Sequence, residues 1–153
     1  MSNEDSFQFA VKSASFLQDI EKFNEMYRLP SPPVPSLTHE RLGSFYRILG
    51  EELEEVSDII LSLEEDGKIK HSEILTDIAD WLGDIVVYCV SEMRRYGLKP
   101  EKVLGIIMQS NFSKLGEDGK PIYDERGKVL KGPGYWKPEP QIKAYIESEI
   151  GEK

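Results

Sequence analysis

The chain has 153 residues, a formal net charge of −9 and 39% hydrophobic residues. This length corresponds to one domain, and the negative charge argues against general binding to nucleic acid or to anionic membranes. A single cysteine excludes a disulfide framework, and no apolar run approaches the roughly 20 residues that span a bilayer. The first five residues also lack the basic and apolar regions of a signal peptide, so we expect a cytoplasmic protein.

The N-terminal part predicts one helix followed by an extended connector. Aromatic and aliphatic residues recur at roughly helical spacing over 7–27, with Asp5 or Ser6 as the helix cap. The proline-rich segment 29–35 cannot be helical. A further helix begins near Thr38 and lacks the acidic residue that would complete a capping box, so it starts earlier or is uncapped.

Two long runs, 42–63 and 74–96, have apolar residues three and four positions apart and predict two helices. Each run contains a cluster of acidic residues without Lys or Arg: Glu51, Glu52 and Glu55 in the first run, and Asp77, Asp80 and Asp84 in the second. Glu52 and Glu55 lie on the apolar stripe of their helix. Charged groups beside a core are costly unless they are paired or bound to a metal.

The connection between the two runs is short, so the two helices should be antiparallel neighbours. Gly67 is expected to end the first helix and Ser72 to cap the second. Counting outward from this turn places the two clusters level to within about one helical turn. Oxygen ligands of this kind select Mg²⁺ or Mn²⁺, so we predict a metal site formed by four carboxylates: Glu52, Glu55, Asp80 and Asp84.

The simpler interpretation of acidic residues on a helix is a solvated face. This interpretation suits Glu51, Glu54 and Asp58. Asp77 could equally be an acid of the first helical turn, where the helix dipole favours negative charge.

The second long run is apolar nearly all round over 85–90, which indicates packing against another subunit. We therefore expect at least a homodimer, or a dimer of dimers. A fourth helix should begin at Pro100 and end near 113. The glycine-rich and lysine-rich extension 115–153 follows a helical core over 5–114, with a small hairpin pairing 120–123 with 128–130 and a last helix over 141–150.

The pattern Glu51-Glu52-x-x-Glu55, followed by an acid pair in a second helix, resembles the all-α nucleotide pyrophosphohydrolases. These comprise MazG-like proteins, dimeric dUTPases and phosphoribosyl-ATP pyrophosphohydrolases, which share the motif Glu-x-x-Glu and then Glu-x-x-Asp. The segments 110–115, 118–122 and 127–133 resemble the branch with a lysine-rich C-terminal extension, and the resemblance spans 42–138. If Asp84 is the final Asp of the motif, Trp81 stands three residues before it and Asp80 must substitute. The alternative register is Asp77-x-x-Asp80.

The resemblance implies an all-α, MazG-like bundle of four to five helices that hydrolyses a nucleoside triphosphate between the α and β phosphates. The cofactor would be Mg²⁺, with Mn²⁺ as a substitute, and Glu51 would activate water or hold a second metal. The residues expected to contact phosphate or sugar are Asn111, Lys114, Lys131 and Tyr135. The alternative role of Asn111 is a helix C-cap, and the alternative for Lys114 and Lys131 is a position in a solvated loop.

Two alternative functions are also open. One is phosphoribosyl-ATP pyrophosphohydrolase activity in histidine synthesis. The other is a non-catalytic helical dimer that is stabilised by metal. No residue can be assigned to the edge of a base, so the sequence does not predict the preferred nucleotide.

Overall fold

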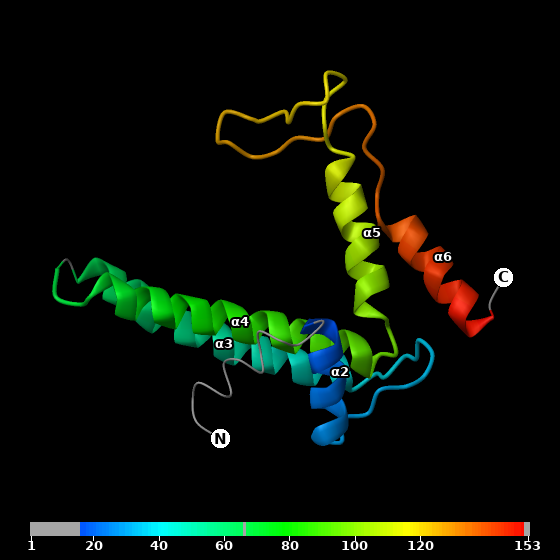
Figure 1. Ribbon diagram of the computed structural model, residues 1–153, viewed down its shortest axis with the longest axis horizontal. Helices are drawn as coiled ribbons and strands as arrows, with labels where there is room; N and C mark the ends of the chain where they lie inside the picture. Colours follow the sequence, from blue (N-terminus) through cyan, green and yellow to red (C-terminus); the bar gives the residue numbers. More distant parts are fainter. Residues whose placement is uncertain (1–15, 66, 152–153) are drawn as a thin grey trace. The chain divides into compact units, whose positions relative to one another are not determined.

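The computed structural model describes residues 16–65 and 67–151, and its regular elements there are all helices (Figure 1). The predicted all-α class is therefore confirmed. The helices are α2 (Phe16–Met26), α3 (Arg41–Glu64), α4 (His71–Arg95), α5 (Pro100–Phe112) and α6 (Glu139–Ile150). The predicted hairpin is present as one antiparallel bridge between Tyr123 and Val129. None of the helices in the described ranges is long and apolar enough to cross a membrane.

The helix boundaries agree with the apolar periodicity better than with the predicted caps. α3 begins after Glu40 without a side-chain cap, as the missing capping box indicated. The prediction for Ser72 is wrong, because α4 starts after Lys70 and Ser72 lies inside the helix, where its carbonyl accepts a hydrogen bond from Thr76. Gly67 does not cap α3 either; it lies in the following turn with φ of 73°. The predicted caps Asp5 and Ser6 lie outside the described residues.

The chain forms two compact units. Among described residues, the first unit comprises 16–31 and 36–96, and the second comprises 32–35 and 97–151. The boundary after residue 96 assigns α5 to the C-terminal unit, whereas the sequence suggested a core that extends to 114. The two units are described separately below.

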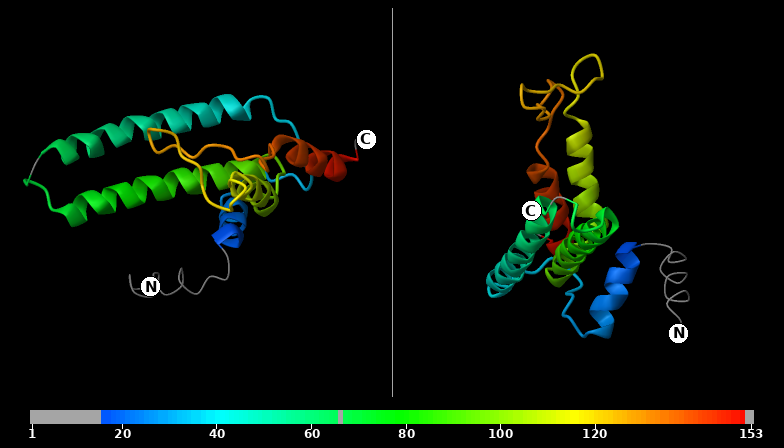
Figure 2. Two further views of the ribbon diagram at one scale, coloured as in Figure 1. Left: turned by 90° about the horizontal axis from the view of Figure 1, so that it is seen from above. Right: turned by 90° about the vertical axis from the view of Figure 1, so that its left-hand side faces the viewer.

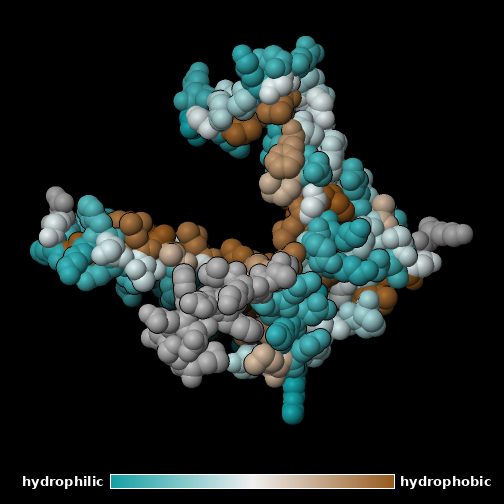
Figure 3. Space-filling view, viewed as in Figure 1, coloured by the Kyte–Doolittle hydropathy of each residue, from teal (hydrophilic) through white to brown (hydrophobic). Residues whose placement is uncertain are grey.

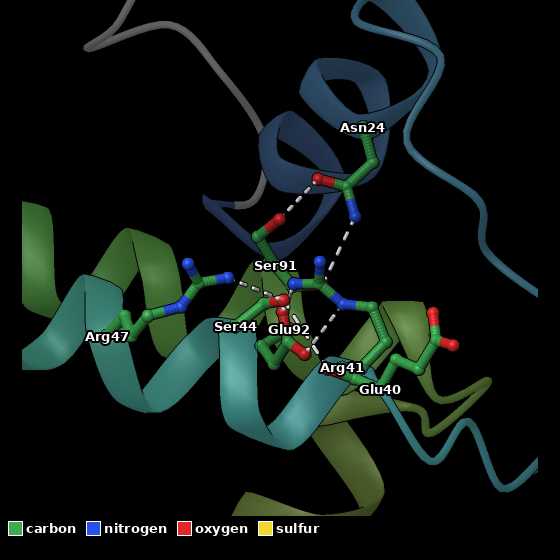
Figure 4. A network of polar contacts seen from close by, with 7 residues as sticks. All are labelled: Asn24, Glu40, Arg41, Ser44, Arg47, Ser91 and Glu92. Atoms are coloured by element: carbon green, nitrogen blue, oxygen red, sulfur yellow. Dashed lines mark hydrogen bonds and ion pairs between the residues drawn. The ribbon is translucent and has the colours of Figure 1, made fainter.

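The first unit consists of the antiparallel hairpin of α3 and α4, with α2 packed against α4 (Figures 1 and 2). Polar contacts between these helices are shown in Figure 4. Ser91 of α4 donates a hydrogen bond of 2.6 Å from Oγ to Asn24 Oδ1 of α2, and Asn24 Nδ2 donates to the Ser91 carbonyl at 3.2 Å. Arg41 of α3 forms a two-pronged ion pair with Glu92 of α4, with Nε 3.1 Å from Oε1. Because Asn24 and Glu92 are buried, these bonds fix how the three helices meet.

The hairpin leaves much of its apolar surface uncovered. Among the described residues, only four hydrophobic side chains are fully buried: Ile20, Ile74, Val90 and Val103. On α3 and α4, Leu53 is 62% exposed and Leu82 is 50% exposed. Figure 3 shows hydrophobic residues along the edge of this hairpin. Large exposed apolar side chains that gather on one element commonly mark an interaction face.

The second unit ties the C-terminal segment to α5. The Ser110 hydroxyl, on a residue only 2% exposed, donates to the Trp136 carbonyl at 2.9 Å, and the Trp136 amide donates to Ser113 Oγ at 3.2 Å. The Lys99 amide donates to the Tyr145 hydroxyl of α6 at 3.0 Å. Gly97 begins the longer stretch of this unit and has φ of 69°. A Cβ at this position would lie 2.1 Å from the Val34 carbonyl oxygen, so only glycine fits there. The C-terminal segment therefore contributes to the structure of this unit.

We predict that Glu92→Ala lowers the free energy of unfolding by about 3 kcal/mol, because it leaves the Arg41 guanidinium without its partner in a mostly buried site. Urea denaturation followed by circular dichroism measures this loss. The control is Glu147→Ala, which removes an exposed i, i+4 pair with Lys143 and should cost at most about 0.5 kcal/mol. Equal effects of the two substitutions would contradict the assigned role of the Arg41–Glu92 pair.

Candidate functional site

Glu52 lies in the middle of α3 and is the one buried residue of that helix, at 7% exposure. Its position on the apolar stripe turns it toward α4, as the spacing predicted. The indole Nε1 of Trp81 on α4 donates a hydrogen bond of 2.8 Å to the Glu52 main-chain carbonyl. The helix seam between α3 and α4 therefore places a carboxylate in a largely dry environment.

In this seam Glu55 and Asp84 lie close enough to Glu52 to influence its ionisation. Burial raises the pKa of Glu52 most, and the neighbouring charges of Glu55 and Asp84 raise it further, with a smaller effect from Glu51. A hydrogen bond from Tyr88 acts in the opposite direction and lowers the Glu52 pKa. The pKa of Tyr88 is itself raised, first by burial and then by the same three carboxylates. Four acidic or phenolic groups from two helices thus share one site.

One oxygen of this site lacks a partner. Glu52 Oε2 is buried and accepts no hydrogen bond from the part of the chain that the structure describes. A buried carboxylate oxygen without a partner is costly, and a divalent cation beside Glu55 and Asp84 would remove that cost. The donor set is entirely oxygen, which suits Mg²⁺ or Mn²⁺. Within residues 16–65 and 67–151, however, no group of three or more His, Cys, Asp or Glu side chains is placed so that it could hold a metal ion.

The remaining predicted ligand, Asp80, lies with Asp84 beside a cavity on α4. Asp80 and Asp84 line an open cavity of about 600 Å³, together with Phe16 and Leu82. Neither Asp80 nor Asp77 is among the groups that shift the Glu52 pKa. The choice between them as a fourth ligand stays a prediction. Glu51 is exposed on α3, next to the buried Glu52.

The predicted phosphate-contacting residues lie in the second unit and form two pairs. Lys114 Nζ donates a hydrogen bond of 2.7 Å to Asn111 Oδ1, and Lys131 Nζ lies 4.6 Å from the centre of the Tyr135 ring. The alternative role of Asn111 as a helix C-cap is wrong, because Ser113 holds that position. Each lysine thus has a neighbouring side chain that restricts its orientation. A lysine in a solvated loop does not need such a contact.

A tight backbone contact joins these two pairs. The Gly132 amide donates to the Lys114 carbonyl at 2.8 Å, and a Cβ on Gly132 would lie 1.9 Å from the Leu115 carbonyl oxygen. No residue with a side chain fits at this position. Gly132 therefore brings the segment that follows Lys131 against the end of α5.

Sequence reasoning did not assign roles to several residues of these sites. The spacing places Tyr88 on the same helical stripe as Asp84, four residues after it, but does not predict its effect on Glu52. The role of Trp81 as a donor across the seam, and the roles of Ser110 and Ser113 in holding the C-terminal segment, depend on tertiary contacts. Their spacing in the sequence carries no signal for these roles.

No protein-family model and no curated protein matches the chain. Its structure is similar to the crystal structure of a putative NTP pyrophosphohydrolase from Exiguobacterium sp. 255-15, with a TM-score of 0.52 and 23% sequence identity. The match covers 92% of this chain and 98% of the other. The two proteins share an all-α fold. At this level of identity the likeness concerns the fold alone.

We predict that Glu52→Gln stabilises the protein at neutral pH when divalent cations are removed with EDTA. Because the folded state raises the Glu52 pKa, its contribution to stability is present below the unfolded value, near 4.5, and is lost as pH rises through the folded value. Glutamine cannot ionise, so the melting temperature of the variant should exceed that of the parent at pH 7, and the difference should shrink toward pH 4. Glu54→Gln, on the exposed side of α3, is the control. A lower melting temperature for Glu52→Gln at pH 7 would contradict the assigned electrostatics.

We predict that Gly132→Ala displaces the segment around Lys131 from the end of α5, because the added Cβ would overlap the Leu115 carbonyl. The amide signals of Lys114 and Leu115 in a nuclear magnetic resonance spectrum should shift strongly. Gly105→Ala is the matched control, since a Cβ there meets nothing within 4 Å and should leave those signals in place. Identical spectra for both variants would show that the close approach of Gly132 is not maintained in solution.

Proposed function

We propose that the protein hydrolyses a nucleoside triphosphate between the α and β phosphates, with Mg²⁺ or Mn²⁺, and releases the monophosphate and pyrophosphate. The observation that carries this proposal is the buried, unpartnered oxygen of Glu52 beside Glu55 and Asp84. The fold shared with the Exiguobacterium protein supports a pyrophosphohydrolase reaction, and the sequence motifs around Glu51 point to the same chemistry. A cytoplasmic location remains a prediction.

In this proposal Glu52, Glu55 and Asp84 hold the cation, with Asp80 as the fourth ligand. The cation, when bound, neutralises the charge that develops on the phosphate oxygens. Glu51 projects from the same turn of α3 and is exposed, so it remains available to orient or deprotonate the attacking water. Tyr88 lowers the pKa of Glu52 and so favours the ionised form that binds a cation.

The basic residues of the second unit would contact the phosphates or the sugar. Lys114 is oriented by Asn111, and Lys131 is oriented by the Tyr135 ring. Hydrogen bonds from a charged donor to phosphate are among the strong ones. A basic segment in an acidic chain also lowers the repulsion that a polyphosphate would otherwise meet.

The test is pyrophosphate release from a panel of nucleoside triphosphates with and without Mg²⁺. The parent should release pyrophosphate only with the cation, and Mg²⁺ should raise its melting temperature. Glu52→Gln and Asp84→Asn should lose both effects, and Asp80→Ala should weaken both more than Asp77→Ala. Release of orthophosphate instead of pyrophosphate would contradict the proposed reaction. A metal-dependent rise in melting temperature without any turnover would favour a non-catalytic dimer.

We also propose that a second copy of the chain covers the apolar face of the α3–α4 hairpin. Val86 is 49% exposed although it lies in the stretch 85–90, which the sequence expects to be buried. Leu53 and Leu82 on the same two helices are also exposed, and exposed apolar residues of this size on one hairpin favour an interaction surface. A two-fold arrangement would let the same face on each copy cover the other.

We predict a stable dimer, or a dimer of dimers, in light scattering at micromolar concentration. Leu53→Asp and Leu82→Asp should shift the protein toward the monomer, because each places a charge in an apolar contact. Ile150→Asp, at the end of α6 and 37% exposed, should leave the mass unchanged. A monomeric parent would contradict the proposal.

A further inference from the structure

Trp81 connects the two helices of the seam at the position of Glu52. Its indole ring is half-buried, and its Nε1 donates to the Glu52 carbonyl at 2.8 Å. A carbonyl oxygen has two lone pairs. The Glu52 carbonyl can therefore accept a hydrogen bond from Trp81 while it also accepts a main-chain hydrogen bond within α3. The bond therefore adds a directional contact between α3 and α4 without breaking α3.

This bond bears on the carboxylates because of where Trp81 lies on α4. Asp84 follows it by three residues and Tyr88 by seven, so all three lie on one face of the helix. Trp81 holds the main chain of Glu52 and Tyr88 bonds to its side chain. Glu52 is thus held at both ends, while its Oε2 atom stays without a partner.

Apolar contacts have no preferred direction. By themselves they therefore define poorly how far one helix is shifted along the axis of its neighbour. A hydrogen bond weakens steeply when its angle or length changes. Sliding or rotation of α3 that moved Glu52 away from Asp84 would break the indole bond. The bond from Trp81 to Glu52 therefore favours the register in which the carboxylates face one another.

We propose that Trp81 is a positioning residue: through its indole N–H it fixes the height of Glu52 relative to Asp84 and so tightens the binding of a divalent cation by these carboxylates. This inference rests on the proposed function, since it concerns the same cation. It assigns Trp81 no contact with the cation or with the nucleotide. Its effect arises wholly through the main chain of α3.

The experiment measures Mn²⁺ binding at pH 7 from the electron paramagnetic resonance signal of free Mn²⁺, with no nucleotide present. Trp81→Phe removes the donor and reduces the ring. A second variant carries benzothienylalanine at position 81, which keeps the bicyclic ring but replaces N–H with sulfur. The control is Trp136→Phe, because Trp136 takes part in hydrogen bonds through its main chain. Circular dichroism in EDTA establishes that each variant is folded before the titration.

Both variants at position 81 should bind Mn²⁺ roughly tenfold more weakly than the parent, as for loss of a group that orients a metal ligand. Trp136→Phe should bind like the parent. If the benzothienylalanine variant binds like the parent, ring packing rather than the N–H bond is responsible and the inference is wrong. If the parent binds Mn²⁺ and Trp81→Phe binds equally well, the inference fails while the proposed function stands. A parent that binds no Mn²⁺ would overturn both.

Discussion

The arrangement of the first unit depends on one costly interaction, the burial of the Glu52 carboxylate between α3 and α4. Burial and the neighbouring charges of Glu55 and Asp84 oppose its ionisation, and its Oε2 has no partner in the described chain. Such a cost persists in a folded protein when other contacts offset it. Here those contacts are the Trp81 bond at the site itself and the Arg41–Glu92 pair nearer the end of the hairpin. The helices therefore hold carboxylates together that would repel one another without a cation.

Two lysines of the second unit lie beside partner side chains, Lys114 beside Asn111 and Lys131 beside the Tyr135 ring. Ser110 and Ser113 bind the segment around Trp136, and Gly132 packs its backbone against Leu115, so the C-terminal extension is fixed to α5 rather than free. Lys114 is oriented by this framework through Asn111.

The periodicity of apolar residues predicted α3, α4 and α5 to within a few residues, because helices of this length are determined by one face. The same periodicity placed Glu52 in the seam. It could not predict that α4 begins before Ser72, since its start is set by the turn from α3 rather than by a side-chain cap. Nor could it predict the indole bond of Trp81 or the attachment of the C-terminal segment to α5, which join residues far apart in the sequence. The fourth ligand is undecided for a similar reason, because Asp77 and Asp80 both lie near the face of Asp84 and spacing alone does not separate them.

We expect the carboxylates of the seam to repel one another until a divalent cation binds between them. A double-mutant cycle of Glu52→Gln and Asp84→Asn, followed by chemical denaturation in EDTA and again in Mg²⁺, measures their coupling directly. In EDTA the coupling between the two carboxylates should be unfavourable, so that each substitution stabilises less when the other is already present. In Mg²⁺ the coupling should become favourable. A coupling of the same sign and size under both conditions would contradict the claim that these side chains share a cation.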